Sequence, residues 1–346
     1  MSLRSTLLLI LVLGGCAAKS SDSSEPPPSR VEVATSPAAR PTSVVVEPLS
    51  PETDPGFSPP LRARIEPDAP ADTVTFGWKT PCSVPARSFK SRSGKGSAIT
   101  RMNIVVEARE DGDVMLLESL EFERLNGEAI DTEEERAQVE ASLAMARAVM
   151  PRFYISPEGA YERVVGMDEM IDALLSWRGS SEKVADMMRQ PQMKAQLQAV
   201  AGDIWLTWVE SWAGLALQPG HPVTGSQEVS AFSTSMPAEF VVEHLGTLEG
   251  APELRLLHTR SVVDGDEARE AMLRMLQGFS DQVDGPPLDE NAIESMRRVD
   301  DLWVAIDPDG AFPHHVRRET VIEVNDQRRE DVQAWEFDWS QAVGCR

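Results

Sequence analysis

Much of the chain alternates apolar and polar residues, which is the pattern of β-strands that bury one face. In the segment 102–107, Met102, Ile104 and Val106 would share one face, and the residues between them would share the other. In the segment 118–125, apolar and acidic side chains alternate in the same way. Because one face is polar, these strands predict an antiparallel sheet that is exposed to water on one side.

The strand pattern, and a helical pattern that follows it, occur twice. The sequence ISPEGAY at 155–161 returns as IDPDGAF at 306–312, and both contain the proline–acid–glycine order of a tight turn. Matching segments precede the two copies in the same order: 105–107 and 241–243, 116–117 and 256–257, and the helical segments 133–149 and 266–279. This agreement in order and spacing predicts an internal repeat.

The repeat predicts an α+β fold. We expect two tandem related units, at 71–178 and 219–346, each with an antiparallel sheet, a helix and a hairpin. A helical bridge at 179–218 would join them.

The bridge carries a stripe of three tryptophans. Trp205, Trp208 and Trp212 fall on one helical face, and Pro191 interrupts the helical pattern before them. Such a stripe is typical of a core, and that is our prediction; a ligand site or a membrane contact is the alternative.

The N-terminus has the three parts of an export signal. Arg4 is basic, the apolar run 6–13 is too short to span a bilayer, and Leu13-Gly14-Gly15-Cys16 follows it. This tetrad resembles the lipobox of bacterial lipoproteins, which implies that residues 1–15 are a signal peptide and that Cys16 carries diacylglycerol. Ala17 stands where that family has Asp in proteins retained at the inner membrane. The resemblance therefore implies a lipid anchor in the outer membrane facing the periplasm, with the cell surface left open.

Residues 16–70 are rich in serine and hold twelve of the 25 prolines. A segment of this composition buries too little apolar surface to fold, so we expect a disordered tether. Its one apolar patch, 43–49, is either a docking strand or unfolded chain.

The chain is strongly acidic, with 56 Asp and Glu against 33 Lys and Arg and a formal net charge of -23. This balance opposes nucleic-acid binding, which needs clustered cations, and it favours solubility. Of the three cysteines, Cys82 and Cys345 remain once Cys16 is lipidated. Because exported proteins meet an oxidising compartment, we expect these two to form a disulfide.

Catalytic motifs are weak. Ser180 and Lys183 fit the Ser-x-x-Lys spacing of penicillin-recognising enzymes, but the companion motifs of that group are missing and a helix start explains the pair. His315 and Glu319 would share a strand face, and pairing within the second sheet would bring His244 and His258 towards them. Solvent-facing strand histidines are the simpler interpretation. We therefore predict no catalytic residue, no metal site and no cofactor.

The inferred architecture, a sheet with helices in an exported lipoprotein, resembles the half-barrel lipoprotein carriers and related lipid-binding lipoproteins. In that group a concave apolar face holds acyl chains. The resemblance rests on inferred architecture and compartment and not on a motif, so no functional residue of that group is assigned to a position of this chain. The sequence thus predicts a non-enzymatic outer-membrane lipoprotein that binds an apolar ligand or an envelope component. The alternative is an envelope scaffold with protein partners and no small-molecule ligand; a hydrolase would need a Ser, His and Asp brought together by the fold.

Overall fold

The chain folds mainly as β-sheet. The computed structural model describes residues 32–33, 43–46, 61–66, 69–178, 186, 188–231, 234–282 and 293–346. Strands make up 52% and helices 23% of the structure, and fifteen strands of the described residues belong to one sheet. The α+β prediction is therefore wrong. The strands are longer than their apolar stretches, because ion-paired charged residues occupy part of both faces of the sheet. In the sequence, such charged stretches resemble loops, so the prediction underestimated the strand content; Gln327–Phe337, for example, begins with five polar residues.

The sheet is antiparallel throughout its long strands. In spatial order, its continuous path is β1-β12-β13-β14-β15-β16-β17-β5-β6-β7-β9-β10. The long strands are β5 (Cys82–Arg92), β6 (Gly96–Arg109), β7 (Gly112–Leu125), β12 (Val223–Ala231), β13 (Thr234–Leu248), β14 (Ala251–Asp264), β15 (Met296–Asp307), β16 (Phe312–Val324) and β17 (Gln327–Phe337). The short strands are β1 (Glu32–Val33), β2 (Ser43–Val46), β3 (Leu61–Arg64), β8 (Glu128–Ala129), β9 (Arg152–Ile155) and β10 (Tyr161–Val165), and β4 (Asp72–Thr73) pairs separately with β11 (Ala216–Leu217).

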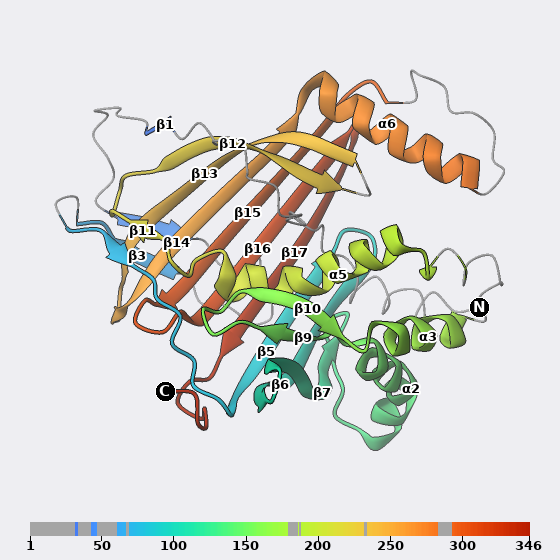
Figure 1. Cartoon of the computed structure of the whole chain (residues 1–346), viewed down its shortest axis with the longest axis horizontal. Helices are drawn as coiled ribbons and strands as arrows, with labels where there is room; N and C mark the ends of the chain where they lie inside the picture. Colours follow the sequence, from blue (N-terminus) through green and yellow to red (C-terminus); the bar gives the residue numbers. More distant parts are fainter. Residues whose placement is uncertain are drawn as a thin grey trace.

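The two halves of the chain follow the same order of elements. Three antiparallel strands, β5 to β7, precede helix α2 (Glu133–Val149) and the hairpin β9–β10; β12 to β14 likewise precede α6 (Gly265–Gln282) and the pair β15–β16. The last strand, β17, then pairs antiparallel with the first long strand, β5. This junction joins the two halves into one sheet (Figure 1).

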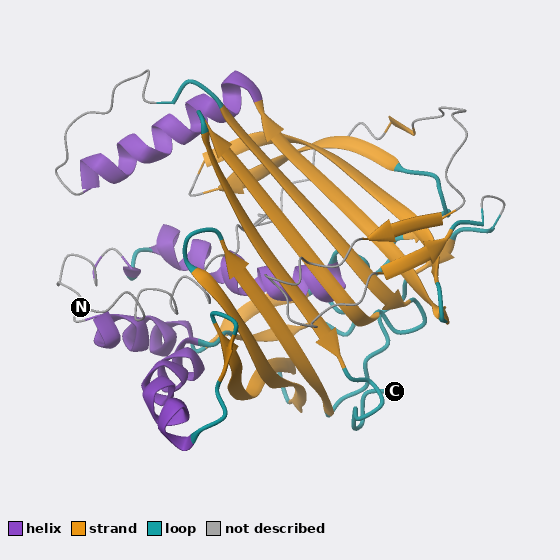
Figure 2. Ribbon diagram, turned by 180° about the vertical axis from the view of Figure 1, so that it is seen from behind, coloured by secondary structure: helices purple, strands orange, loops and turns teal. Residues whose placement is uncertain are grey.

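The remaining helical elements are α3 (Met167–Arg178), α5 (Pro191–Trp205) and the π-helical turn η1 (Leu206–Glu210) that continues α5. Helices α5 and α6 cross the same side of the sheet, as Figure 1 shows, and Figure 2 shows the strands from behind. We call the helix-covered side the inner face and the opposite side the outer face. Along β17, Arg329, Asp331, Gln333, Trp335 and Phe337 alternate onto the inner face.

The inner face holds the largest core. Trp205, Trp208 and Trp212 are fully buried there, so the tryptophan stripe is core, as predicted. The Trp205 indole N–H donates to the Gly159 carbonyl at 2.7 Å, and the Trp212 indole N–H donates to the Thr207 carbonyl at 3.1 Å. These aromatic side chains fill the space between η1 and one end of the sheet.

Part of the segment expected to be a tether is ordered. Strand β2 pairs with β3, and β3 pairs in turn with β13. Leu61, Ala63 and Ile65 are buried, so the expected disorder does not hold for residues 61–66. Their apolar–polar alternation is that of a strand with one buried face, and the surrounding prolines conceal it in the sequence.

The ends of the folded body are joined covalently. Cys82, at the start of β5, forms a disulfide with Cys345, and their Cα atoms are 4.5 Å apart. The predicted bridge is therefore present. Beside it, the Val343 N–H donates to the Ser83 carbonyl at 2.9 Å and the Ser83 N–H donates to the Val343 carbonyl at the same distance.

Candidate functional site

An apolar cavity lies between the inner face and the helices α2, α3 and α5. Its volume is about 160 Å³, and strands β5, β6, β7 and β17 form its floor. Most lining side chains are apolar, among them Met102, Leu120, Phe122, Ala146 and Ala201. Ala146 on α2 and Ala201 on α5 are small, so they leave space that larger side chains would fill.

One margin of the cavity is polar. Lys90 on β5, Gln333 on β17 and Asp203 on α5 line it there. Lys90 is directly opposite Gln333 in the sheet, and Gln333 is directly opposite Arg318 on β16. Directly opposite residues share a face, so this row runs across the inner face at the point where apolar side chains give way to charged ones.

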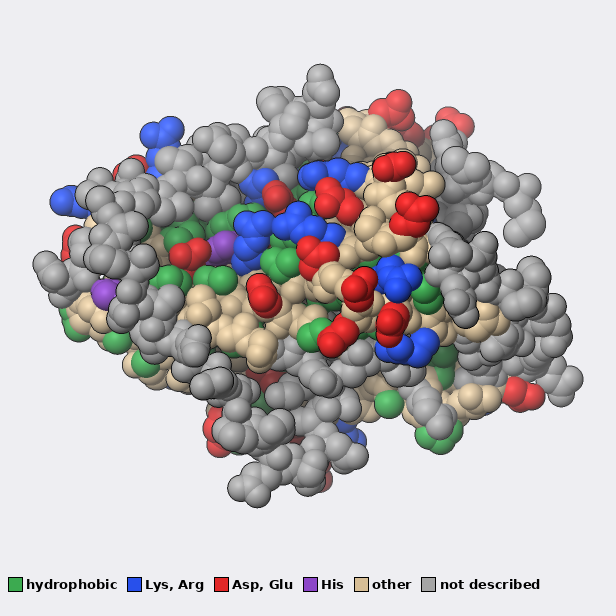
Figure 3. All heavy atoms as spheres, turned by 90° about the horizontal axis from the view of Figure 1, so that it is seen from above, with side chains coloured by type: hydrophobic (Ala, Val, Ile, Leu, Met, Phe, Trp, Pro, Cys, Tyr) green, Lys and Arg blue, Asp and Glu red, His purple; other side chains and the backbone are tan. Residues whose placement is uncertain are grey.

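Beyond this row the inner face is charged. We call the group the charged strip; its members are Lys90, Arg92, Asp203, Arg298, Asp300, Arg318, Arg329 and Asp331. The sheet register places Asp300 opposite Thr320, Thr320 opposite Asp331, and Asp331 opposite Arg92. Figure 3, seen from above, shows basic and acidic side chains next to one another over the middle of the face that it presents.

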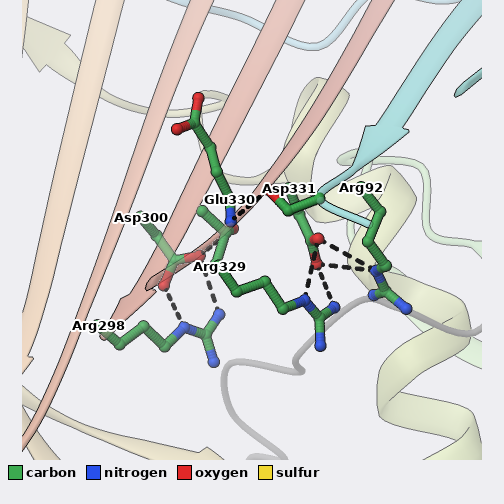
Figure 4. A network of polar contacts seen from close by, with 8 residues as sticks. Arg92, Arg298, Asp300, Arg329, Glu330 and Asp331 are labelled. Carbon is green, nitrogen blue, oxygen red and sulfur yellow. Dashed lines mark hydrogen bonds and ion pairs between the residues drawn. The ribbon is translucent and has the colours of Figure 1, made fainter. Parts of the chain in front are cut away.

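Each carboxylate of the strip is held by arginine. Asp331 lies between Arg92, at 3.0 Å, and Arg329 (Figure 4). Asp300 accepts two hydrogen bonds from Arg298, at 2.6 and 2.9 Å, and a third from Thr320. These bidentate pairs fix both partners, because a guanidinium presents two parallel N–H donors to a carboxylate.

An ion pair connects the strip to the helix above the cavity. Arg318 on β16 donates to Asp203 on α5 at 2.6 Å, and their side chains are only 15% and 14% exposed. A second carboxylate, Asp300, lies 3.8 Å from the same guanidinium. The pair therefore holds α5 against the sheet at the margin of the cavity.

Burial and charge shift the pKa values of the strip. Burial first, and then the nearby Arg92, lowers the pKa of Lys90 from 10.5 to about 7, against the opposing effect of Asp331. Burial opposes the charged form of Asp300 as well, but Arg298 and Arg318 outweigh it and lower the pKa of that carboxyl. Lys90 is therefore the cation of the strip whose charge is most costly to maintain.

The histidines do not assemble a metal site. On the outer face, both ring nitrogens of His258 contact carboxylates, Glu243 at 2.8 Å and Asp301 at 3.0 Å, and the ring stacks on Trp303. Burial disfavours the charged ring, but the two carboxylates raise its pKa. Across the described part of the chain, no group of three or more His, Cys, Asp or Glu side chains is arranged to hold a metal ion.

The other members of the considered histidine group lie apart. His244 is buried, with Nδ1 3.4 Å from the Leu217 carbonyl oxygen. Glu319 accepts from Arg317. His315 has its Nδ1 4.0 Å from Glu336. His315 and Glu319 are therefore next to different side chains, Glu336 and Arg317.

Several sequence predictions fall outside the described residues. These are the lipobox with Cys16 and the Ser180–Lys183 pair. Within the described residues, no helix is long and apolar enough to cross a membrane.

Comparison with known protein families and with curated proteins finds no match. Among solved structures, the chain is similar to lipovitellin in a structure that concerns lipid–protein interactions, with 9% identity and a TM-score of 0.36. The match covers 78% of this chain and 25% of lipovitellin, so the chain spans about a quarter of that protein's length.

Proposed function

We propose that this protein is an exported, non-enzymatic lipoprotein of the outer membrane whose body binds an apolar ligand between the sheet and α5. The observation that carries the proposal is the cavity itself, a space of about 160 Å³ lined mostly by apolar side chains. Cores are normally filled to the density of organic crystals, so a space of this size is a departure that a ligand would remove.

The cavity has room for part of a ligand. An engineered apolar cavity of about 150 Å³ in another protein accepts benzene, so this one accepts a ring or a short alkyl segment. Each methylene buried there contributes about 0.8 kcal/mol. The rest of a longer ligand would lie along the margin formed by Lys90 and Gln333.

The neutral fluorophore N-phenyl-1-naphthylamine tests the proposal, because it brightens in an apolar environment. The measurement uses the full chain with Cys16→Ser, which removes the predicted acylation site and the need for detergent that would compete for the cavity. We expect saturable binding at one site per chain, lost in Ala201→Phe, where a ring fills the cavity from α5. The matched control is Ala144→Phe, at an exposed position of α2. Absence of binding, or equal binding by both variants, would contradict the proposal.

The packed aromatic core favours a second candidate. Because Trp205, Trp208 and Trp212 fill one end of the inner face, most of the sheet is not free to hold a ligand. A scaffold that binds envelope proteins on its acidic exterior would have this property. In that case the fluorophore would fail to bind, while partners would be recovered by cross-linking in the intact envelope and lost on reversal of exterior charges.

A further inference from the structure

We propose that the ligand is a neutral amphiphile, with its apolar part in the cavity and an uncharged polar group, a hydroxyl or an amide, hydrogen-bonded to Gln333 and Thr207. This inference rests on the proposed function, because it names the chemical class that the same cavity takes. It stands on the polar side chains of the cavity lining, some of which have partners in the protein and some of which do not.

The polar, non-aromatic side chains that line the cavity are Ser88, Lys90, Thr100, Asp203, Thr207 and Gln333. Four of them interact with other parts of the protein. The hydroxyls of Ser88 and Thr100 hydrogen-bond to each other, and Asp203 accepts from Arg318 at 2.6 Å. The Lys90 ammonium belongs to the charged strip and has partners there. To bind a ligand, these four groups would have to exchange an existing interaction for a new one.

The remaining two groups are the amide of Gln333 and the hydroxyl of Thr207. Within the described part of the chain, neither of these side chains forms a hydrogen bond. Thr207 is only 5% exposed, and Gln333 is half-buried. Because a polar group removed from water without a partner costs free energy, a ligand that hydrogen-bonds to both would recover that cost.

Both groups lie next to the ion pair that holds α5 against the sheet. Gln333 on β17 is directly opposite Arg318 in the register of the sheet. Thr207 on η1 follows Asp203 by four residues, so it lies about one turn farther along the same side of the helix. The cavity therefore has an unpartnered polar group on its sheet wall and another on its helix wall, at the end where Arg318 and Asp203 meet.

The chemistry of these two side chains favours an uncharged partner. An amide and a hydroxyl each donate and accept hydrogen bonds, so they match a ligand group that does the same. A carboxylate or an ammonium would enter without a counter-ion of its own, because the charged side chains of the lining, Lys90 and Asp203, already interact with others. Burial of an unpaired charge is costly. A charged amphiphile should therefore bind less tightly than a neutral one, although its chain still enters the cavity.

Displacement of N-phenyl-1-naphthylamine from the full chain with Cys16→Ser tests this inference. The competitors 1-hexanol and 1-chlorohexane share an alkyl chain and differ in whether the head forms strong hydrogen bonds. The variants Thr207→Val and Gln333→Leu keep the size of each side chain and remove its hydrogen-bonding group. We expect each to weaken the binding of 1-hexanol about fivefold and to leave that of 1-chlorohexane unchanged. The matched control is Thr73→Val, at an exposed threonine of β4 that does not line the cavity.

The parent chain supplies a second test that does not depend on the folding of a variant. A cavity without hydrogen-bond partners would bind 1-hexanol at least about tenfold less tightly than 1-chlorohexane, because the hydroxyl would lose its bonds to water. We expect the two to bind about equally. Weak binding of 1-hexanol by the parent, or the same affinity for 1-hexanol in the parent and both variants, would overturn the inference and leave the proposed function standing. Failure of the fluorophore to bind the parent would instead overturn the proposed function.

Hydroxyls and amides share this chemistry, so a fatty alcohol or glyceride and an acylated amine are both sources of the head. A third competitor, hexanamide, distinguishes them, since the tighter of hexanamide and 1-hexanol identifies the source. Hexanoate carries a charge on a chain of similar length. We expect it to displace the fluorophore less well than either neutral competitor, and a hexanoate that binds more tightly than both would overturn the neutral class.

Discussion

Replacement of Lys90 by methionine should stabilise the protein, and the gain should depend on pH. Methionine keeps the length of the side chain and removes its charge. Burial and Arg92 lower the pKa of Lys90 from 10.5 to about 7, so the folded protein carries this charge at a cost. At 1.36 kcal/mol per pH unit the cost has an upper limit of about 5 kcal/mol. Because the side chain is half-buried and water screens it, we expect a gain of about 2 kcal/mol.

The sign of the pH dependence follows from proton binding. The unfolded chain keeps the Lys90 proton up to pH 10.5, whereas the folded chain loses it above about pH 7. Between these values the unfolded state binds more protons, so the stability of the parent protein rises with pH. Below pH 7 the full cost of the charge is present. The gain from Lys90→Met should therefore be largest at pH 6 and small at pH 10.

Urea unfolding followed by tryptophan fluorescence measures this gain at both pH values. The control is Lys79→Met, which removes an exposed lysine and should change stability by less than about 0.5 kcal/mol at either pH. A variant at Lys90 that is no more stable than the parent at pH 6, or equally more stable at pH 6 and pH 10, would refute the reasoning.

Three further predictions concern other parts of the molecule. Replacement of both Cys82 and Cys345 by serine should lower the free energy of unfolding by about 2–4 kcal/mol, read from urea midpoints; an unchanged midpoint would mean that the bridge does not constrain the unfolded chain. His258→Gln should lower the free energy of unfolding by about 1.5 kcal/mol more at pH 6 than at pH 9. The pKa of His258 is raised in the folded protein, so the charged ring adds stability that is fully present below pH 6.5 and is lost as pH rises through the folded pKa. Equal losses of stability at the two pH values would exclude a charged ring. Cys16→Ser should abolish incorporation of labelled palmitate and release the protein from the membrane fraction, and persistent labelling would place the acyl chains elsewhere.

Local patterns in the sequence predicted the repeated elements but not their assembly. The turn sequences at 155–161 and 306–312 do lie between paired strands, β9 with β10 and β15 with β16. Turn chemistry and strand alternation are local, so they can be read directly. The pairing of β17 with β5 joins residues about 240 positions apart, and no local signal specifies it. The expectation of a separate sheet in each unit failed at this junction.

The candidate site was missed for a related reason. Its cavity is lined by the small side chains of Ala146 on α2 and Ala201 on α5, and nothing in the local sequence of either helix shows that these two alanines line the same space. The charged strip did leave a signal. Arg298 with Asp300, and Arg329 with Asp331, are opposite charges two positions apart, which share one face of a strand. Pro191 was interpreted as an interruption, but it is the first residue of α5, where proline is well accommodated.

Native mass spectrometry of the full chain with Cys16→Ser, recorded with and without decanoate, tests whether the cavity binds an apolar ligand. We expect one decanoate bound per chain of the parent and of Ala144→Phe, and none on Ala201→Phe. A parent chain that remains free of ligand, or an Ala201→Phe chain that binds decanoate as well as the parent does, would contradict it.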